Sequence, residues 1–146
     1  MNSYTWEDLQ PGLAATFEVG VTERMMRDFL ATSGDENPLH IEEEYATDRG
    51  FRGRVVYGML TASFYSTLAG VYLPGKHCLL HGLSVDFNAP VYVGDRLRVR
   101  GEVAYKNDTF KRIEIDARIE NQAGVLVSKG RLRLGWIGER GGGPSS

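Results

Sequence analysis

The chain has 146 residues, of which 42% are hydrophobic and 25% are charged, values typical of one soluble globular domain. Its formal net charge of −2 at pH 7 gives no electrostatic basis for binding nucleic acid. The single cysteine, Cys78, excludes an internal disulfide framework, and with only 3 histidines no metal site is expected. The N-terminal residues lack the basic start and apolar run of a signal peptide, so a cytoplasmic location is the default expectation.

The first predicted elements are a strand and a helix. Apolar and polar residues alternate over residues 16–21, which is typical of a strand. Thr22 is a suitable N-cap for the helix that follows, in which apolar residues recur at helical spacing. Gly34 is a suitable end for that helix, because glycine readily adopts the left-handed conformation found just past a helix.

The segment after this helix places an acid and a histidine five positions apart. Pro38 lacks a backbone N–H and disfavours helical backbone in Asn37, so we expect an irregular bend here. Such a bend should bring Asp35 close to His40, and a carboxylate and an imidazole held in a loop are a frequent acid–base pair. Taken separately, each has an ordinary explanation, Asp35 as a turn residue and His40 as a structural histidine.

Beyond His40, the pattern predicts a short helix over residues 41–46, followed by the basic, irregular segment 49–54. The simplest interpretation of that segment is an exposed loop. A weaker alternative is a set of cations near a phosphorylated ligand.

The middle of the chain predicts one long apolar helix over residues 55–72. The uncharged stretch 55–75 is long enough to span a bilayer, but the polar side chains scattered through it favour a buried core helix. Small residues recur every four positions and therefore share one face: Gly58, Ala62, Ser66 and Gly70. A helix that is apolar nearly all round should be wrapped by the rest of the fold.

From Cys78 onward the hydrophobic period changes to two. Strands are predicted around residues 83–87, 97–103, 113–119 and 126–136, with turn residues between them. This pattern is typical of an antiparallel meander with one apolar face. We therefore expect one α+β domain over residues 1–137, with a long central helix wrapped by a curved sheet, and a disordered tail over residues 138–146.

A long helix wrapped by an antiparallel sheet is the hotdog arrangement, and residues 29–66 make the comparison more specific. They resemble the hydratase-2 motif of the MaoC-like family, the (R)-specific enoyl-CoA hydratases. The matching residues are Ser33, Gly34, Asp35, Asn37, Pro38, Leu39, His40, Glu42, Gly50, Phe51, Gly58, Met59 and Leu60. A second similar stretch consists of Phe87, Asn88, Ala89, Pro90 and Val91 with Gly94 and Asp95.

The resemblance implies a lyase, a hydratase or dehydratase acting on 2-enoyl or 3-hydroxyacyl thioesters of coenzyme A or acyl carrier protein. It implies Asp35 and His40 as the catalytic pair and no cofactor. It also implies a substrate site that includes Gly58, through its backbone N–H, and Ser66, and we place Asn37 and Tyr57 there as well. The family usually carries histidine where this chain has Tyr57, so the role of that histidine side chain does not carry over.

Two alternatives remain open at this stage. One is a hotdog thioesterase, in which a carboxylate directs water at the carbonyl carbon. The other is a catalytically silent hotdog domain that binds acyl thioesters. The motif that ends in His40 favours hydration, and the presence of both Asp35 and His40 argues against a silent domain, whereas Tyr57 keeps it open. The open edges of the sheet and the resemblance to hotdog proteins predict a homodimer or a larger homo-oligomer.

Overall fold

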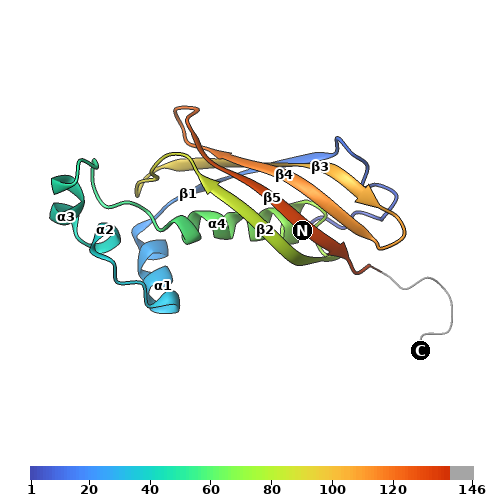
Figure 1. The fold of residues 1–146 in the computed structure, drawn as a ribbon, viewed down its shortest axis with the longest axis horizontal. Coiled ribbons are helices and arrows are strands. Elements are labelled where there is room, and N and C mark those ends of the chain that lie inside the picture. Colours follow the sequence, from blue (N-terminus) through green and yellow to red (C-terminus); the bar gives the residue numbers. More distant parts are fainter. Residues whose placement is uncertain (139–146) are drawn as a thin grey trace.

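The structure, a computed structural model that describes residues 1–138, is built around a curved antiparallel sheet with a helix along one face (Figure 1). Five strands lie in the order β1-β3-β4-β5-β2, and each neighbouring pair is antiparallel. Their bounds are Ala14–Gly20 for β1, Cys78–Phe87 for β2, Arg96–Asn107 for β3, Arg112–Glu120 for β4 and Leu126–Trp136 for β5. The predicted strands are all present, and the α+β hotdog arrangement is confirmed.

Helix α4 (Gly58–Thr67) and the π-helical turn η1 (Leu68–Tyr72) form the central helix. Its start is later than the predicted residue 55, because the preceding residues pair as extended backbone. Val55 forms an isolated bridge with Tyr92, and the Val56 N–H donates to the Val91 carbonyl over 2.8 Å. This pairing holds the start of α4 against the loop between β2 and β3.

The core lies between the central helix and the facing side of the sheet. Tyr65 and Leu68 of the helix are fully buried, as are Val99, Ile115 and Leu132 of the sheet. The prediction of a buried core helix is therefore confirmed. Among residues 1–138, no helix has the length and apolar character needed to cross a membrane.

Three short helices gather at one end of the sheet (Figure 1). They are α1 (Glu23–Ser33), α2 (Pro38–Ile41) and α3 (Glu43–Asp48). Helix α1 has the predicted ends: Thr22 Oγ1 accepts a hydrogen bond from the Met25 N–H, and Gly34 has a φ of 71°. This end of the molecule carries the Asp35–His40 segment.

Two predictions for this region are wrong. Residues 38–41 form a helical turn instead of an irregular bend, because proline at the first helical position lacks only an N–H that would have no partner in the helix. The Asn37 side chain caps this turn by accepting the Leu39 N–H over 2.9 Å. The second short helix starts at Glu43 and not at Ile41. The predicted disordered tail, apart from Gly138, lies outside the described residues.

Candidate active site

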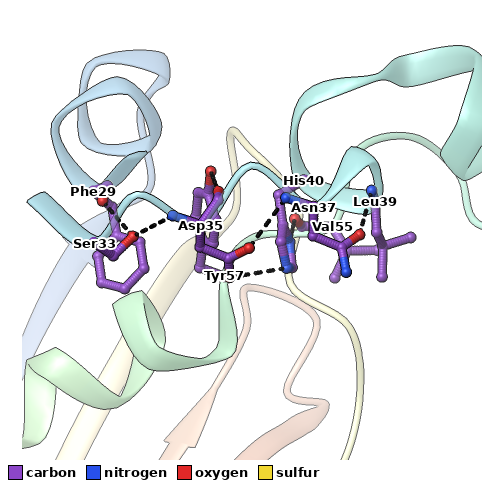
Figure 2. Close-up of polar contacts among 8 residues, drawn as sticks. All are labelled: Phe29, Ser33, Asp35, Asn37, Leu39, His40, Val55 and Tyr57. Atoms are coloured by element: carbon purple, nitrogen blue, oxygen red, sulfur yellow. Dashed lines mark hydrogen bonds and ion pairs between the residues drawn. The ribbon is translucent and has the colours of Figure 1, made fainter. Parts of the chain in front are cut away.

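Asp35 and His40 face one another across the turn that joins α1 to α2 (Figure 2). Asp35 Oδ2 lies 4.0 Å from His40 Nε2, and the two side chains are 46% and 14% exposed. This separation is too long for a direct hydrogen bond and short enough for one water molecule to bridge the two groups. The structure thus brings the two predicted residues together at a place that solvent reaches.

The His40 imidazole is oriented by the backbone in front of α4. His40 Nδ1 lies 2.7 Å from the carbonyl oxygen of Val55 (Figure 2). A carbonyl oxygen only accepts hydrogen bonds, so Nδ1 must carry the proton. In the neutral ring, Nε2 is therefore the unprotonated nitrogen, and it is the atom that faces Asp35.

The Asp35 carboxylate is held from its own loop. Its Oδ1 accepts the Asn37 N–H over 3.1 Å, which leaves Oδ2 turned toward His40. The Asp35 N–H donates to Ser33 Oγ over 3.1 Å, and that hydroxyl donates to the Phe29 carbonyl. The end of α1 therefore fixes the carboxylate with local hydrogen bonds (Figure 2).

Tyr57 contacts both Asp35 and His40. Its hydroxyl donates to the Asp35 carbonyl over 2.8 Å, and its ring centroid lies 4.2 Å from that of His40. Burial raises the pKa of Tyr57, and the charge of Asp35 raises it further, so the hydroxyl keeps its proton and remains a donor. Tyr57 was predicted in the substrate site, but it is 1% exposed and does not line the pocket. Its contacts favour a role in holding Asp35 and His40 instead.

A pocket of about 320 Å³ opens beside His40. Its walls come from α2, the residues that lead into α4, the first turn of α4, the end of β2 with the loop that follows, and the start of β5. The lining includes His40, Gly58, Thr61, Phe87, Val91 and Val127. The volume is at the lower end of the range found for small-molecule sites, and the walls are mostly apolar.

Gly58 places the N-terminus of α4 at this pocket. No side chain caps the helix there, so the first-turn N–H groups lack a capping acceptor. A β-carbon at position 58 would lie 3.2 Å from the ring of Phe87, so the absence of a side chain keeps the helix end open. An uncapped helix N-terminus stabilises negative charge on a bound oxygen.

Two other predicted substrate residues are placed differently. Asn37 uses its side-chain oxygen to cap α2, which is a structural task. Ser66 is exposed two turns beyond Gly58 on α4, outside the lining of this pocket. Within the single chain, Gly58 is therefore the one predicted substrate-binding residue that lines the pocket.

The arginines of segment 49–54 have partners inside the chain. Arg49 and Arg52 lie over the rings of Tyr45 and Tyr92, at 3.5 and 4.3 Å from the ring centroids. Arg54 contacts the carboxylates of Glu23 and Glu43. These contacts account for the segment as a structural loop, and we assign it no phosphate site.

Two residues that line the pocket were not among the predicted site residues. Thr61 is 1% exposed and lies one turn after Gly58, and Phe87 is 51% exposed at the end of β2. The three-residue spacing from Gly58 places Thr61 on the same helix face, a signal that was available from the sequence. Phe87 lies in the second stretch that resembles the family, but its place in the pocket depends on how β2 crosses the start of α4.

Comparison with known proteins gives one consistent picture. A family model described as MaoC like domain matches residues 9–125. The (R)-specific enoyl-CoA hydratase of Aeromonas caviae is 35% identical over 125 residues, which are 80% of this chain and 93% of that protein. The 3-hydroxybutyryl-CoA dehydratase of Methylorubrum extorquens is 33% identical over 99 residues, which are 68% of this chain and 63% of that protein.

The similarity extends to solved structures. The structure titled as an (R)-hydratase from A. caviae involved in PHA biosynthesis superposes with a TM-score of 0.85 at 32% identity. The superposition covers 89% of this chain and 98% of that chain. Sequence and fold are therefore both shared over most of the two molecules.

Proposed function

The chain belongs to the MaoC-like domain family, and we propose that it interconverts 2-enoyl and 3-hydroxyacyl thioesters with Asp35 and His40 as its catalytic pair. It is a lyase, a hydratase or dehydratase of acyl thioesters. The observation that carries the assignment to these residues is their position. Asp35 Oδ2 and His40 Nε2 are 4.0 Å apart, and His40 lines the same pocket as the uncapped N-terminus of α4.

The pair would activate one water molecule. In the hydration direction, the water oxygen forms a bond to C3 while one member of the pair takes a proton from the water. The electrons of the C2=C3 bond move toward the thioester carbonyl, and C2 then receives a proton from the pair. Dehydration is the same path in reverse, so one arrangement serves both directions.

Gly58 would stabilise the charge that develops on the thioester oxygen. Its N–H belongs to the first turn of α4, where no side chain competes for it. The helix dipole adds partial positive charge at this point. A donor that is fixed before the reaction acts mainly on the transition state, in which the oxygen carries the most charge.

Coenzyme A thioesters are the substrates we propose. The curated relatives from Aeromonas caviae and Methylorubrum extorquens carry CoA substrates in their names. Crotonyl-CoA is the simplest probe, because hydration removes its conjugated-enone absorbance and leaves the thioester intact. Hydration is expected as loss of that absorbance without release of free thiol.

The same assay separates the alternatives. Release of thiol would identify a thioesterase in place of a hydratase. No change in absorbance, together with calorimetric binding of butyryl-CoA, would identify a binding domain. A carrier-protein thioester in the same assay decides between the two acyl carriers.

We also propose a homodimer that pairs β2 of one protomer with β2 of a second copy. β2 is an edge strand, because β5 is its only neighbour in the sheet of residues 1–138. Leu79 and Leu80 on this strand are 52% and 41% exposed. An edge strand with exposed apolar side chains is a typical pairing surface.

A cytoplasmic location stays a prediction.

A further inference from the structure

Thr61 carries a buried hydroxyl without a partner. Among residues 1–138, its Oγ1 is one of two buried side-chain polar atoms that have no hydrogen-bond partner. The residue is 1% exposed, and it lines the same pocket as His40 and Gly58. Buried hydroxyls are nearly always hydrogen-bonded, because desolvating one without a partner is costly. An orphan hydroxyl in a pocket wall therefore points to a group that arrives with the ligand.

The position of Thr61 in the helix defines where this hydroxyl acts. Thr61 follows Gly58 by three residues, so both lie on one face of the first turn of α4. Side chains on a helix lean toward its N-terminus, which directs the Thr61 side chain over the turn that begins with Gly58. A helical threonine hydroxyl often donates to the carbonyl one turn back, here that of Tyr57, but Thr61 Oγ1 makes no such bond.

We propose that Thr61 is a catalytic residue whose hydroxyl donates a hydrogen bond to the carbonyl oxygen of the bound acyl thioester, beside the Gly58 N–H. This role rests on the proposed function, because it requires an acyl thioester in the pocket. As water adds to C3, the C2=C3 electron pair moves toward that oxygen, and both donors stabilise the negative charge. When C2 takes its proton, the electron pair returns from the oxygen and the C2–H bond forms.

The test compares Thr61→Val with Thr61→Ser in crotonyl-CoA hydration. Valine has nearly the same shape and β-branching as threonine but no hydroxyl, whereas serine keeps the hydroxyl. We expect kcat to fall about a hundredfold in Thr61→Val, the usual loss for one oxyanion donor, with a smaller change in KM. Thr61→Ser should retain kcat within about threefold of the wild type.

Protein stability gives a second readout, because Thr61→Val should lower kcat without lowering stability. Replacing an unpaired buried hydroxyl with a methyl group should leave the urea midpoint of Thr61→Val unchanged or raise it. The matched control is Ser63→Ala, which removes an exposed hydroxyl that donates to the Leu60 carbonyl over 2.6 Å on the same helix. Ser63→Ala should leave kcat unchanged.

Two results would overturn the proposal. One is a Thr61→Val enzyme with kcat within threefold of the wild type. The other is a Thr61→Val enzyme with a lower urea midpoint that serine restores, because the hydroxyl would then make an internal bond. If the wild type hydrates neither CoA nor carrier-protein thioesters, the proposed function fails, and calorimetry with butyryl-CoA tests Thr61 separately. Weaker binding by Thr61→Val than by wild type and Ser63→Ala supports the contact, and equal binding refutes it.

Discussion

The Tyr57 hydroxyl donates a 2.8 Å hydrogen bond to the backbone carbonyl of Asp35, and the ring of the same tyrosine lies against His40. A single buried side chain at the start of α4 therefore contacts both members of the proposed catalytic pair (Figure 2). Tyr57 stands where the family motif usually has histidine. The contacts favour a positioning role, in which the phenol holds the loop that carries Asp35 against α4, the helix of the proposed substrate donors.

Tyr57→Phe tests this positioning role. The variant keeps the ring against His40 but removes the bond to the Asp35 carbonyl, which should lower the free energy of unfolding by about 1 kcal/mol. We expect kcat to fall about tenfold, because a small displacement of a catalytic group is costly, while KM changes little. Urea denaturation and crotonyl-CoA kinetics measure the two effects.

The comparison variant for Tyr57→Phe is Tyr57→His, which introduces the residue that the family motif usually has. It should recover more activity than phenylalanine if a polar group at this position supports the pair. Equal kcat values for the wild type and Tyr57→Phe would show that the hydroxyl has no part in positioning Asp35.

Gly58→Ala should impair substrate binding and leave stability nearly intact. A methyl group at this position would lie 3.2–3.4 Å from ring atoms of Phe87, but that ring is 51% exposed and free to move. Alanine also favours the helix by up to about 1 kcal/mol relative to glycine, so we expect little net change in unfolding free energy. The methyl group narrows the pocket beside the N–H donor, so KM should rise about tenfold or more.

The double variant Gly58→Ala with Phe87→Ala separates crowding by the Phe87 ring from obstruction of the residue-58 N–H by the new methyl group. Recovery of KM in the double variant would assign the defect to crowding. A Gly58→Ala enzyme with wild-type KM would exclude the thioester from this end of α4.

Tyr65→Phe should destabilise the protein without affecting catalysis. The fully buried Tyr65 hydroxyl donates to Ser128 Oγ over 2.8 Å, and Ser128 Oγ donates to the Asp86 carbonyl over 2.9 Å. Removing the phenol hydroxyl should cost about 1–2 kcal/mol of unfolding free energy, because it breaks a buried chain of hydrogen bonds. The expected kcat is that of the wild type, since Tyr65 does not line the pocket.

The pH dependence of stability gives Tyr65→Phe a second readout. Burial raises the pKa of Tyr65, so the folded state favours the neutral phenol. The resulting stabilisation is complete below about pH 10, where the unfolded phenol is also neutral, and is lost as the pH rises from there through the folded pKa. Between about pH 9 and about pH 11 the wild type should lose more stability than Tyr65→Phe. Equal losses would place the Tyr65 hydroxyl in contact with solvent.

The β2 edge should hold the oligomer together. We expect light scattering to give at least twice the mass of the 16.2 kDa chain, and the double variant Leu79→Lys with Leu80→Lys to dissociate it. Lysines on an edge strand oppose pairing through charge repulsion. Phe110→Lys is the matched control, because Phe110 is 69% exposed in the turn between β3 and β4. A wild type that scatters as a monomer would contradict the dimer.

The sheet and α1 were predictable because their signals are local. Period-two alternation marked all five strands, and Thr22 and Gly34 marked the ends of α1, since the side chain and the left-handed backbone that cap a helix act within a few residues. The start of α4 was not predictable in this way. It depends on Val55 and Val56 pairing with residues about 35 positions away in the chain.

The candidate site was predictable only in part for the same reason. Asp35 and His40 are joined by one short turn, so their spacing already suggested contact. The support that Tyr57 gives to Asp35, the ring of Phe87 at Gly58 and the missing partner of Thr61 all arise from tertiary packing. Ser66 and Asn37 were predicted in the substrate site from the family motif. The motif did not reveal that Ser66 lies on an exposed face of α4 or that Asn37 caps α2.

The most direct test is the hydration of crotonyl-CoA by the wild type, Asp35→Asn and His40→Ala, with folding confirmed by circular dichroism. Glu36→Gln is the control, since it removes an exposed carboxylate next to Asp35 that has no role in the proposed chemistry. We predict an active wild type, an unchanged Glu36→Gln, and kcat reduced by about a thousandfold in both site variants. Folded Asp35→Asn and His40→Ala enzymes with activity within tenfold of the wild type would contradict the assignment of the catalytic pair.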